Sequence, residues 1–250
     1  MKKSRSKLRA LICAAALLSL LGAFRSPARA DLVSSDGQLR YYDETGREAS
    51  EIGMDLSFYN NQVDFEALKA QGIRFVIIRL GGRGWGTGHM YGDRQTQIFL
   101  RSARDAGLQV GAYFFSTAIN VTEAVEEAEA ALKTLDGYTL DLPLYIDMEW
   151  SGDYPNGRAD SVSAWERAAI VAAFSDTVEA AGYRSGIYAS EGYLRYETDA
   201  RAIAGLPTWL ANYTLENRLP EYTGDYELWQ FTDSDYLGGL DGPADLNVRF

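Results

Sequence analysis

From residue 51 onward, short apolar stretches alternate with segments of helical periodicity, and this alternation restricts the possible folds most strongly. Apolar stretches of strand length lie at residues 52–57, 74–80, 109–116, 141–150 and 184–189. Helical patterns separate them, at residues 63–71, 94–106, 122–135 and from 161 or 163 to 181, and residues 191–203 are irregular or helical. Three further strand stretches follow with little helix between them, at 208–213, 227–232 and 244–248.

This order of elements is typical of parallel strands covered by helices. Residues 75–78, Phe-Val-Ile-Ile, are as apolar as a strand covered on both faces should be. The expected fold is therefore α/β, a single irregular TIM-like β/α barrel of about eight strands and roughly five helices. We expect this domain to occupy residues 51–250, with its active site at the C-terminal ends of the strands.

The first 30 residues have the composition of a signal peptide. Basic residues between positions 2 and 9 precede an apolar run at 10–24, which is too short for a comfortable membrane span. Ala28-Arg29-Ala30 fits a small-x-small cleavage site, so the mature chain is expected to begin at Asp31. An uncleaved N-terminal anchor is the alternative. Cleavage would give a secreted or periplasmic protein without a stable membrane anchor, and the polar residues 31–50 are expected to form a flexible N-terminal lead.

Charge and cysteine content exclude several kinds of partner. Cys13 is the only cysteine and lies in the expected signal peptide, so the mature chain has no disulfide. Seven of the 24 Lys and Arg residues and none of the 35 Asp and Glu residues lie in residues 1–30. The remainder carries 17 basic against 35 acidic residues, a formal net charge of −18. This balance argues against nucleic acid or an anionic membrane as partner. We expect a monomer.

The strand at residues 144–150 ends in two acids, Asp147 and Glu149. Residues two apart on a strand point to the same face, so the two carboxylates share one side. Carboxylates that share a site push each other's pKa apart, which can provide one acid and one base or charge stabiliser. Taken alone, the pattern is also compatible with one acid paired to an Arg and the other facing solvent at the strand's end.

Other strand ends carry more acids and aromatic rings. Asp55 lies on the first strand and Asp245 on the last, and these two strands are neighbours in a closed barrel. Four carboxylates would then line one mouth. Flat rings that can stack on sugars lie at other strand ends, although a single such ring more often fills the core: Tyr113, Phe115, Trp150, Tyr188, Tyr213 and Trp229. Acids together with stacking platforms indicate hydrolysis of a glycosidic bond.

Six short motifs, in this order, resemble glycoside hydrolase family 25, the Chalaropsis-type lysozymes that act as N-acetylmuramidases on bacterial peptidoglycan. The resemblance covers about residues 52–249. The motifs occupy residues 53–57 (GMDLS), 111–115 (GAYFF), 145–149 (YIDME), 209–213 (WLANY), 229–232 (WQFT) and 242–247 (GPADLN). The resemblance implies a β/α barrel with fewer than eight helices. It also implies cleavage of the β-1,4 bond between N-acetylmuramic acid and N-acetylglucosamine, with net retention.

The resemblance also implies a role for each acid. Glu149 would protonate the leaving oxygen. Asp147 would orient the substrate's own 2-acetamido group as it assists the reaction, or would instead be a direct nucleophile. Asp55 and Asp245 would raise the pKa of Glu149 and hold substrate or water, and Tyr113 would contact the substrate. The chain departs from many relatives in carrying Phe114 in place of a His, which we expect to alter a substrate contact.

Other features point away from metal, cofactor or triad chemistry. Residues 81–88 are glycine-rich but lack the Gly-Lys-Ser/Thr of a phosphate loop, so a mobile rim loop is expected, with Trp85 as a sugar contact or surface filler. His89, the only histidine, has no nucleophile motif nearby, and no metal or cofactor is expected. The acidic residues 123–129 are expected to form a solvated helix face. A hydrolase of chitin or a similar N-acetylated glycan, and a non-catalytic glycan-binding barrel, are the alternative functions.

Overall fold

The computed structural model describes residues 31–250 apart from 36, 153–156, 200, 202 and 214–217. The expected signal peptide lies outside the described residues, and its cleavage stays a prediction. No helix within the described ranges is both long and apolar enough to cross a membrane.

Eight strands close into one mixed barrel, as predicted, and β3 pairs with both β11 and β4 to complete the ring. In chain order they are β3 (Glu51–Leu56), β4 (Ile73–Arg83), β6 (Gln109–Ser116), β7 (Leu144–Met148), β8 (Ser185–Ser190), β9 (Thr208–Ala211), β10 (Leu228–Asp235) and β11 (Ala244–Arg249).

The last strand is the exception to the expected parallel sheet. β11 runs antiparallel to both β10 and β3, whereas the other barrel pairs are parallel. Only residues 236–243 connect β10 to β11. So short a connection cannot carry the chain back to start a parallel neighbour, which needs a crossover of a dozen or more residues.

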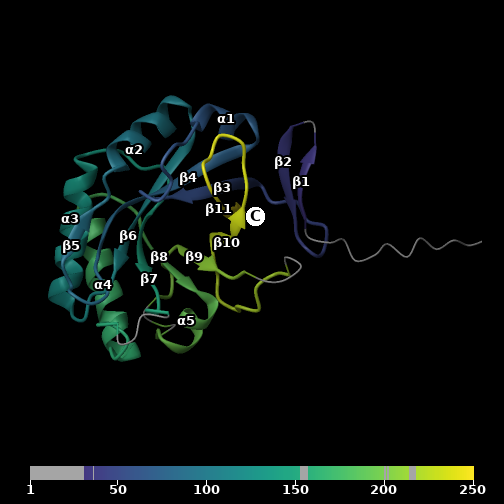
Figure 1. The fold of residues 1–250 in the computed structure, drawn as a ribbon. Helices are drawn as coiled ribbons and strands as arrows, with labels where there is room; N and C mark the ends of the chain where they lie inside the picture. Colours follow the sequence, from purple (N-terminus) through teal and green to yellow (C-terminus); the bar gives the residue numbers. More distant parts are fainter. Residues whose placement is uncertain (1–30, 36, 153–156, 200, 202, 214–217) are drawn as a thin grey trace, which may run out of the picture.

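Five helices occur in the described part of the chain, mainly outside β3 to β8 (Figure 1). They are α1 (Phe65–Ala70), α2 (Thr96–Asp105), α3 (Val121–Leu135), α4 (Ala164–Ala180) and α5 (Glu191–Tyr196), of which α5 is shorter than predicted. α4 begins with a capping box between Ser163 and Glu166. α3 begins at Val121 rather than the expected Thr122, because the extended Asn120 backbone lets the Asn120 side chain cap the helix by accepting from the Glu123 amide at 3.0 Å.

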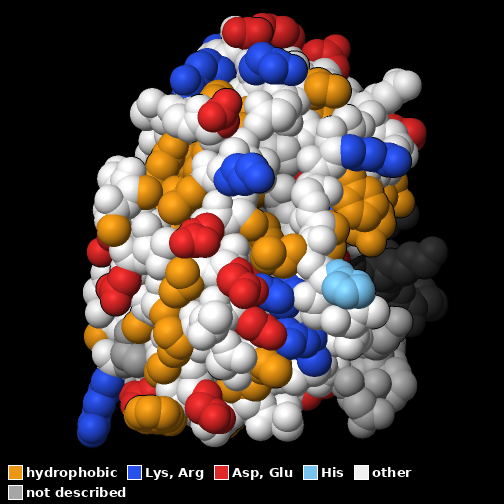
Figure 2. Space-filling view, turned by 90° about the vertical axis from the view of Figure 1, so that its left-hand side faces the viewer, with side chains coloured by type: hydrophobic (Ala, Val, Ile, Leu, Met, Phe, Trp, Pro, Cys, Tyr) orange, Lys and Arg blue, Asp and Glu red, His pale blue; other side chains and the backbone are white. Residues whose placement is uncertain are grey.

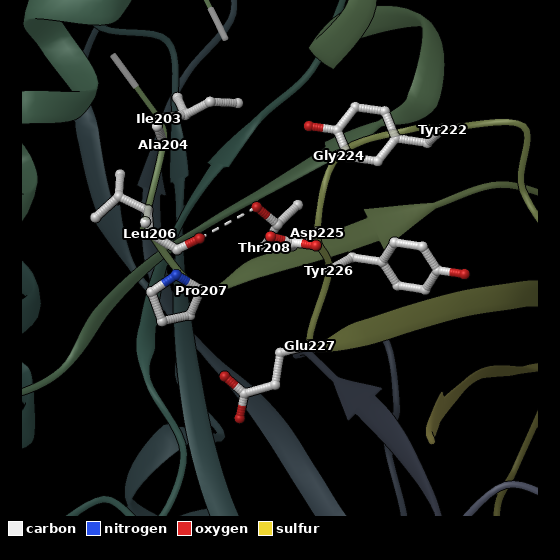
Figure 3. A pocket seen from close by; sticks show the side chains of 11 residues that line it. Ile203, Ala204, Leu206, Pro207, Thr208, Tyr222, Gly224, Asp225, Tyr226 and Glu227 are labelled. Atoms are coloured by element: carbon white, nitrogen blue, oxygen red, sulfur yellow. Dashed lines mark hydrogen bonds between the residues drawn. The ribbon is translucent and has the colours of Figure 1, made fainter. Parts of the chain in front are cut away.

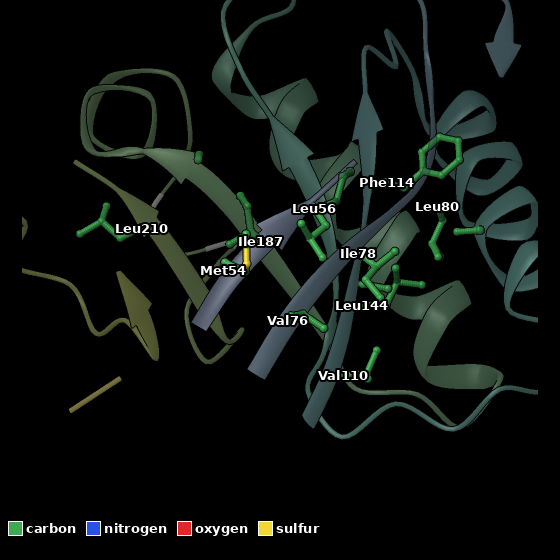
Figure 4. Close-up of a cluster of buried hydrophobic side chains, with 14 of the residues drawn as sticks. Met54, Leu56, Val76, Ile78, Leu80, Val110, Phe114, Leu144, Ile187 and Leu210 are labelled. Carbon is green, nitrogen blue, oxygen red and sulfur yellow. The ribbon is translucent and has the colours of Figure 1, made fainter. Parts of the chain in front are cut away.

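Side chains alternate between two buried faces along each strand. One set points outward into the layer between strands and helices, where Met54, Val76, Ile78 and Leu144 belong to a single large apolar cluster (Figure 4). The other set points into the barrel, where a smaller cluster includes Phe75, Ile77, Tyr113, Leu142, Tyr145, Tyr188, Trp209, Ala211 and Leu228. The barrel is therefore filled below its mouth, and only the top of the inner face is left for polar side chains.

Residues 31–50, predicted as a flexible lead, contain a β-hairpin of β1 (Asp31–Ser35) and β2 (Gln38–Tyr42). Tyr41 on this hairpin is fully buried, with its ring centroid 5.7 Å from that of Trp229 and 4.6 Å from that of Phe231. Both partners lie on the outer face of β10, where the chain supplies little helix. The hairpin, on the right of Figure 1, covers this face as the helices cover the strands opposite. The domain boundary at residue 50 stays a prediction.

The glycine-rich segment is a hairpin rather than a loop. β4 continues to Arg83 and pairs antiparallel with β5 (Met90–Gly92), so Gly81 and Gly82 belong to the strand. A Cβ atom at Gly81 would lie 2.3 Å from the Tyr91 carbonyl oxygen, and one at Gly82 would lie 2.6 Å from the Tyr91 hydroxyl. The glycines are needed because β5 approaches β4 this closely.

Candidate active site

The four predicted acids converge on one cavity of about 390 Å³ at the mouth of the barrel. Asp55 and Asp147 lie at the C-terminal ends of β3 and β7, and Glu149 follows β7 directly. Asp245 reaches the same mouth from the beginning of β11, because that strand runs in the opposite direction and pairs Asp245 with Asp55. The lining residues are Asp55, Arg79, Tyr113, Phe115, Asp147, Glu149, Tyr188, Trp209, Tyr213, Gln230, Asp233 and Asp245.

Asp55 is held in place by two side-chain amides. Gln230 donates from Nε2 and Asn247 from Nδ2 to the same Asp55 oxygen, at 2.7 Å and 2.9 Å. Burial nonetheless raises the pKa of Asp55 to about 6, because desolvation outweighs the stabilisation of the charged form by the two donors. Burial and the charge of Asp55 together raise the pKa of Asp245 to about 8, with a hydrogen bond between the two carboxyls. These acids therefore share a proton near neutral pH.

Asp147 and Glu149 form the second carboxyl pair. Asp147 is 3% exposed, and its pKa is raised well above the usual range by burial and then by the charge of Glu149. Glu149 is accessible at the mouth, yet enough protein surrounds its carboxyl for desolvation to raise its pKa as well. One oxygen of Asp147 is buried without a hydrogen-bond partner. At neutral pH the pair can therefore provide one protonated and one ionised carboxyl, the arrangement needed for acid catalysis.

Two of the predicted substrate-binding rings line the acid cavity from inside the barrel. Tyr113 and Tyr188 both pack against Trp209, with ring centroids 5.7 Å and 4.4 Å from that ring. Tyr188 also donates from its hydroxyl to Gln230 Oε1 at 2.7 Å. Tyr113 and Tyr188 are buried, so little of either ring can meet a substrate.

Two other predicted rings are exposed beside the acids. Trp150 and Tyr213 line an adjoining cavity of about 530 Å³ that also includes Glu149 and Tyr188, and Tyr213 lines the acid cavity as well. Trp150 is 44% exposed and leans on Tyr193, while Tyr213 is 50% exposed and donates its hydroxyl to Gln230 at 2.6 Å. These positions suit stacking on a sugar that extends from the acids.

Trp229 and Phe114 do not belong to the site. Trp229 points to the outer face of β10, where it is fully buried against Tyr41 and donates from Nε1 to the Asn212 carbonyl at 2.9 Å. The prediction that it binds substrate is wrong, because neighbouring residues of a strand face opposite sides and Gln230 takes the inner position. Phe114 likewise lies in the outer apolar cluster, so its replacement of a His alters no contact at the mouth.

The acidic run on α3 is not simply solvated. Glu127 is fully buried, accepts from Arg83 Nε at 2.8 Å and from Ser116 Oγ at 2.6 Å, and has its pKa raised to about 7 by burial. Arg158 donates to both oxygens of Glu123, at 2.6 Å and 2.7 Å. Charged side chains of both signs lie side by side on this face (Figure 2). The cluster ties the β4–β5 hairpin to α3.

The β4–β5 hairpin forms one rim of the barrel mouth. Trp85 in its turn is half-buried, with its ring centroid 4.8 Å from that of Phe115, which lines the acid cavity. Its contact with sugar stays a prediction. His89 is exposed in the same turn and does not line that cavity.

Four polar residues of the site were not predicted: Gln230 and Asn247, which hold Asp55, and Arg79 on β4 and Asp233 on β10, which line the cavity. The signal for the first two was present, since a polar residue two positions from Leu228 or Asp245 shares its inward face. Within the described ranges, no cluster of three or more His, Cys, Asp or Glu side chains could hold a metal ion.

A second cavity of about 550 Å³ lies away from the acids (Figure 3). It is lined by residues 203–208 and by residues 222 and 224–227, where β9 and β10 begin. The N-terminal ends of these strands are at the opposite end of the barrel from the mouth. One of its two acids, Glu227, is already paired with Arg184 at 2.9 Å. The four predicted acids thus line the smaller of these two cavities.

Comparison with known proteins finds likeness in both sequence and fold. A model of the family described as glycosyl hydrolases family 25 matches residues 54–240. An autolytic lysozyme of Clostridium acetobutylicum is 27% identical over 195 residues, which cover 78% of this chain and 54% of the lysozyme.

Two solved structures share the fold. The modular autolysin LytC of Streptococcus pneumoniae superposes with a TM-score of 0.72 at 24% identity, covering 87% of this chain and 52% of LytC. LytC is also known in complex with a synthetic peptidoglycan ligand. A family 25 glycosyl hydrolase of Bacillus anthracis superposes with a TM-score of 0.66 at 22% identity, covering 81% of this chain and 89% of that hydrolase. This chain spans about half the length of the Clostridium lysozyme and of LytC.

Proposed function

The chain belongs to family 25 of the glycosyl hydrolases, and from this we propose that it is a lysozyme. It hydrolyses the β-1,4 bond between N-acetylmuramic acid and N-acetylglucosamine in peptidoglycan. The observation that carries the proposal is the mouth itself, where two pairs of carboxyls with raised pKa values face a cavity flanked by the exposed rings of Trp150 and Tyr213. The known peptidoglycan ligand of LytC supports this substrate class.

In the first step, Glu149 donates its proton to the glycosidic oxygen as the bond from that oxygen to C1 breaks. The carbonyl oxygen of the substrate's 2-acetamido group forms a bond to C1 from the opposite side. Asp147 accepts a hydrogen bond from the acetamido N–H and stabilises the positive charge that develops on the resulting ring. Its buried oxygen without a partner supports this role, because that oxygen is an acceptor left for the substrate.

In the second step, Glu149 takes a proton from water and the water oxygen attacks C1. This attack breaks the bond between C1 and the acetamido oxygen that formed in the first step. Two displacements at C1 give net retention, and both carboxyls return to their starting protonation states. The negative charge of Asp245 favours the protonated form of Glu149 before the first step, and that of Asp55 acts in the same direction on Asp147. The enzyme acts as an exported monomer after removal of residues 1–30.

Mass spectrometry of peptidoglycan digested with the purified protein tests the activity. We expect fragments with reducing N-acetylmuramic acid ends, initially in the β-anomeric form by NMR. Anhydro-muramic ends would show a lytic transglycosylase, release from chitin alone would show a different substrate, and pelleting with wall material without release would show a binding protein. Glu149→Gln should abolish release while Glu129→Gln, the same change on the exposed face of α3, should not. Intact-mass measurement of protein from the extracellular or periplasmic fraction tests cleavage before Asp31.

A further inference from the structure

Arg79 is a cation in a cavity of acids. It lies on the inner face of β4, paired in register with Tyr113 on β6, and is the only basic residue among those that line the cavity. The side chain is buried, with 9% of the residue exposed. The function proposed above assigns it no role.

The structure fixes the guanidinium from several sides. Arg79 donates from Nε to Asp93 Oδ2 at 3.2 Å, and Asp93 is itself held by the Phe58 and Gln95 amides at 2.7 Å and 3.0 Å. The guanidinium carbon lies 4.7 Å from the ring centroid of Phe58 and 5.3 Å from that of Tyr59. This arrangement leaves the side chain little freedom to move.

One donor of this guanidinium is unused. Nη2 of Arg79 is buried without a hydrogen-bond partner, and Asp147, which lines the same cavity, has an unpartnered buried oxygen. Burying a charge with an unused donor is unfavourable unless its field or its hydrogen bond serves another group. The carboxyls that line the same cavity are the groups available to this cation.

We propose that Arg79 is a positioning residue that favours the ionised form of Asp147 against burial and thereby favours a transferable proton on Glu149. The proposal rests on the proposed function, because it assigns the two states that the reaction needs. Asp147 is surrounded by protein, where charges interact strongly, whereas Glu149 is accessible to water that screens the same field. The cation therefore acts more strongly on Asp147.

The other charges at the mouth would assign the proton the opposite way. Burial and the charge of Glu149 favour the protonated form of Asp147, and Arg79 opposes both. The titratable and charged groups that face the pair come from eight elements and one loop: Asp55 on β3, Arg79 on β4, Tyr91 on β5, Tyr113 on β6, Tyr188 on β8, Tyr193 on α5, Tyr213 after β9, Asp233 on β10 and Asp245 on β11. Since Arg79 is the positive member of this set, its removal should favour the protonated form of Asp147 still further.

Carboxyl ¹³C NMR titration of the purified protein tests this without requiring activity. Arg79→Met should raise the pKa of Asp147 by at least one unit, and Arg79→Lys should keep it within about half a unit of wild type. Asp93→Asn should lower it, because the guanidinium is then no longer balanced by its partner. Arg101→Met, which removes a charge from the exposed side of α2, should leave it unchanged. An unmoved Asp147 titration in Arg79→Met overturns the proposal. If Arg79→Met does not fold, an unmoved Asp147 titration in Asp93→Asn overturns it.

The pH profile of peptidoglycan release tests the same proposal through catalytic activity. In Arg79→Met, kcat should fall at least 100-fold at neutral pH and the acidic limb of the profile should move upward with the Asp147 titration. Arg79→Lys should restore the wild-type limb even if kcat recovers only partly. Loss of activity with an unmoved limb would show a structural role and overturn the proposal. If wild type releases no fragments but the NMR titrations shift as stated, the proposed function fails while the role of Arg79 on Asp147 stands.

Discussion

Replacing Asp55 with Asn should stabilise the protein at neutral pH while it reduces activity. Burial raises the pKa of Asp55 from 3.8 to about 6. Each unit of difference between folded and unfolded states corresponds to about 1.36 kcal/mol, so the ionised carboxyl lowers the free energy of unfolding by about 3 kcal/mol. A melting temperature changes by roughly 2–4 °C per kcal/mol in a domain of this size, which gives a difference of roughly 6–12 °C.

The sign follows from the direction of the shift. A carboxyl whose folded pKa is raised stabilises the folded state below its unfolded pKa of 3.8, and this contribution is lost as the pH rises through about 6. Asn resembles the protonated carboxyl, and its oxygen can still accept from Gln230 and Asn247. Loss of the Asp55 charge also removes one cause of the raised pKa of Asp245, which changes stability in the same direction.

Thermal melts of wild type and Asp55→Asn between pH 4 and pH 8 measure this effect. The two proteins should melt at similar temperatures near pH 4, and the variant should be more stable above pH 6. Asp176→Asn, the same change on the exposed side of α4, should follow the wild-type curve. If Asp55→Asn loses stability as steeply as wild type between pH 4 and pH 7, the inference that Asp55 is buried at a cost is wrong.

Three further predictions concern single side chains. Glu149→Gln should lower kcat by about 10²–10⁴-fold without lowering the melting temperature, measured by release of reducing ends and by circular dichroism. Activity within tenfold of wild type would exclude Glu149 as the acid. Trp229→Ala should destabilise the protein by about 3–5 kcal/mol, whereas Trp150→Ala should raise KM and leave urea unfolding unchanged. Tyr41→Ala should also lower the urea midpoint, because the free energy of unfolding should fall by about 2–4 kcal/mol. An unchanged midpoint would show that the β1–β2 hairpin is not part of the folded unit.

The inward and outward faces of the strands explain what the sequence could and could not predict. Nearly continuous apolar stretches gave the positions of the barrel strands, and the acids at their ends gave the mouth. Trp229 was misplaced because apolar side chains were expected at the site, whereas the inner face near the mouth is polar and takes Gln230. The direction of β11 has no local signal, since an antiparallel strand has the same side-chain period as a parallel one. Asp245 still reaches the mouth because its strand begins there.

The carboxyls at the mouth and the apolar contacts on the outer face of β10 have opposite effects on the free energy of unfolding. Four carboxyls with raised pKa values oppose folding at neutral pH, so the apolar contacts elsewhere must offset them. Around β3 to β8 the helices supply those contacts, but little helix accompanies β9 to β11. Tyr41 buries Trp229 and Phe231 there instead. Residues before the barrel therefore complete its core, and their removal should be least tolerated at the pH where most of the acids are ionised.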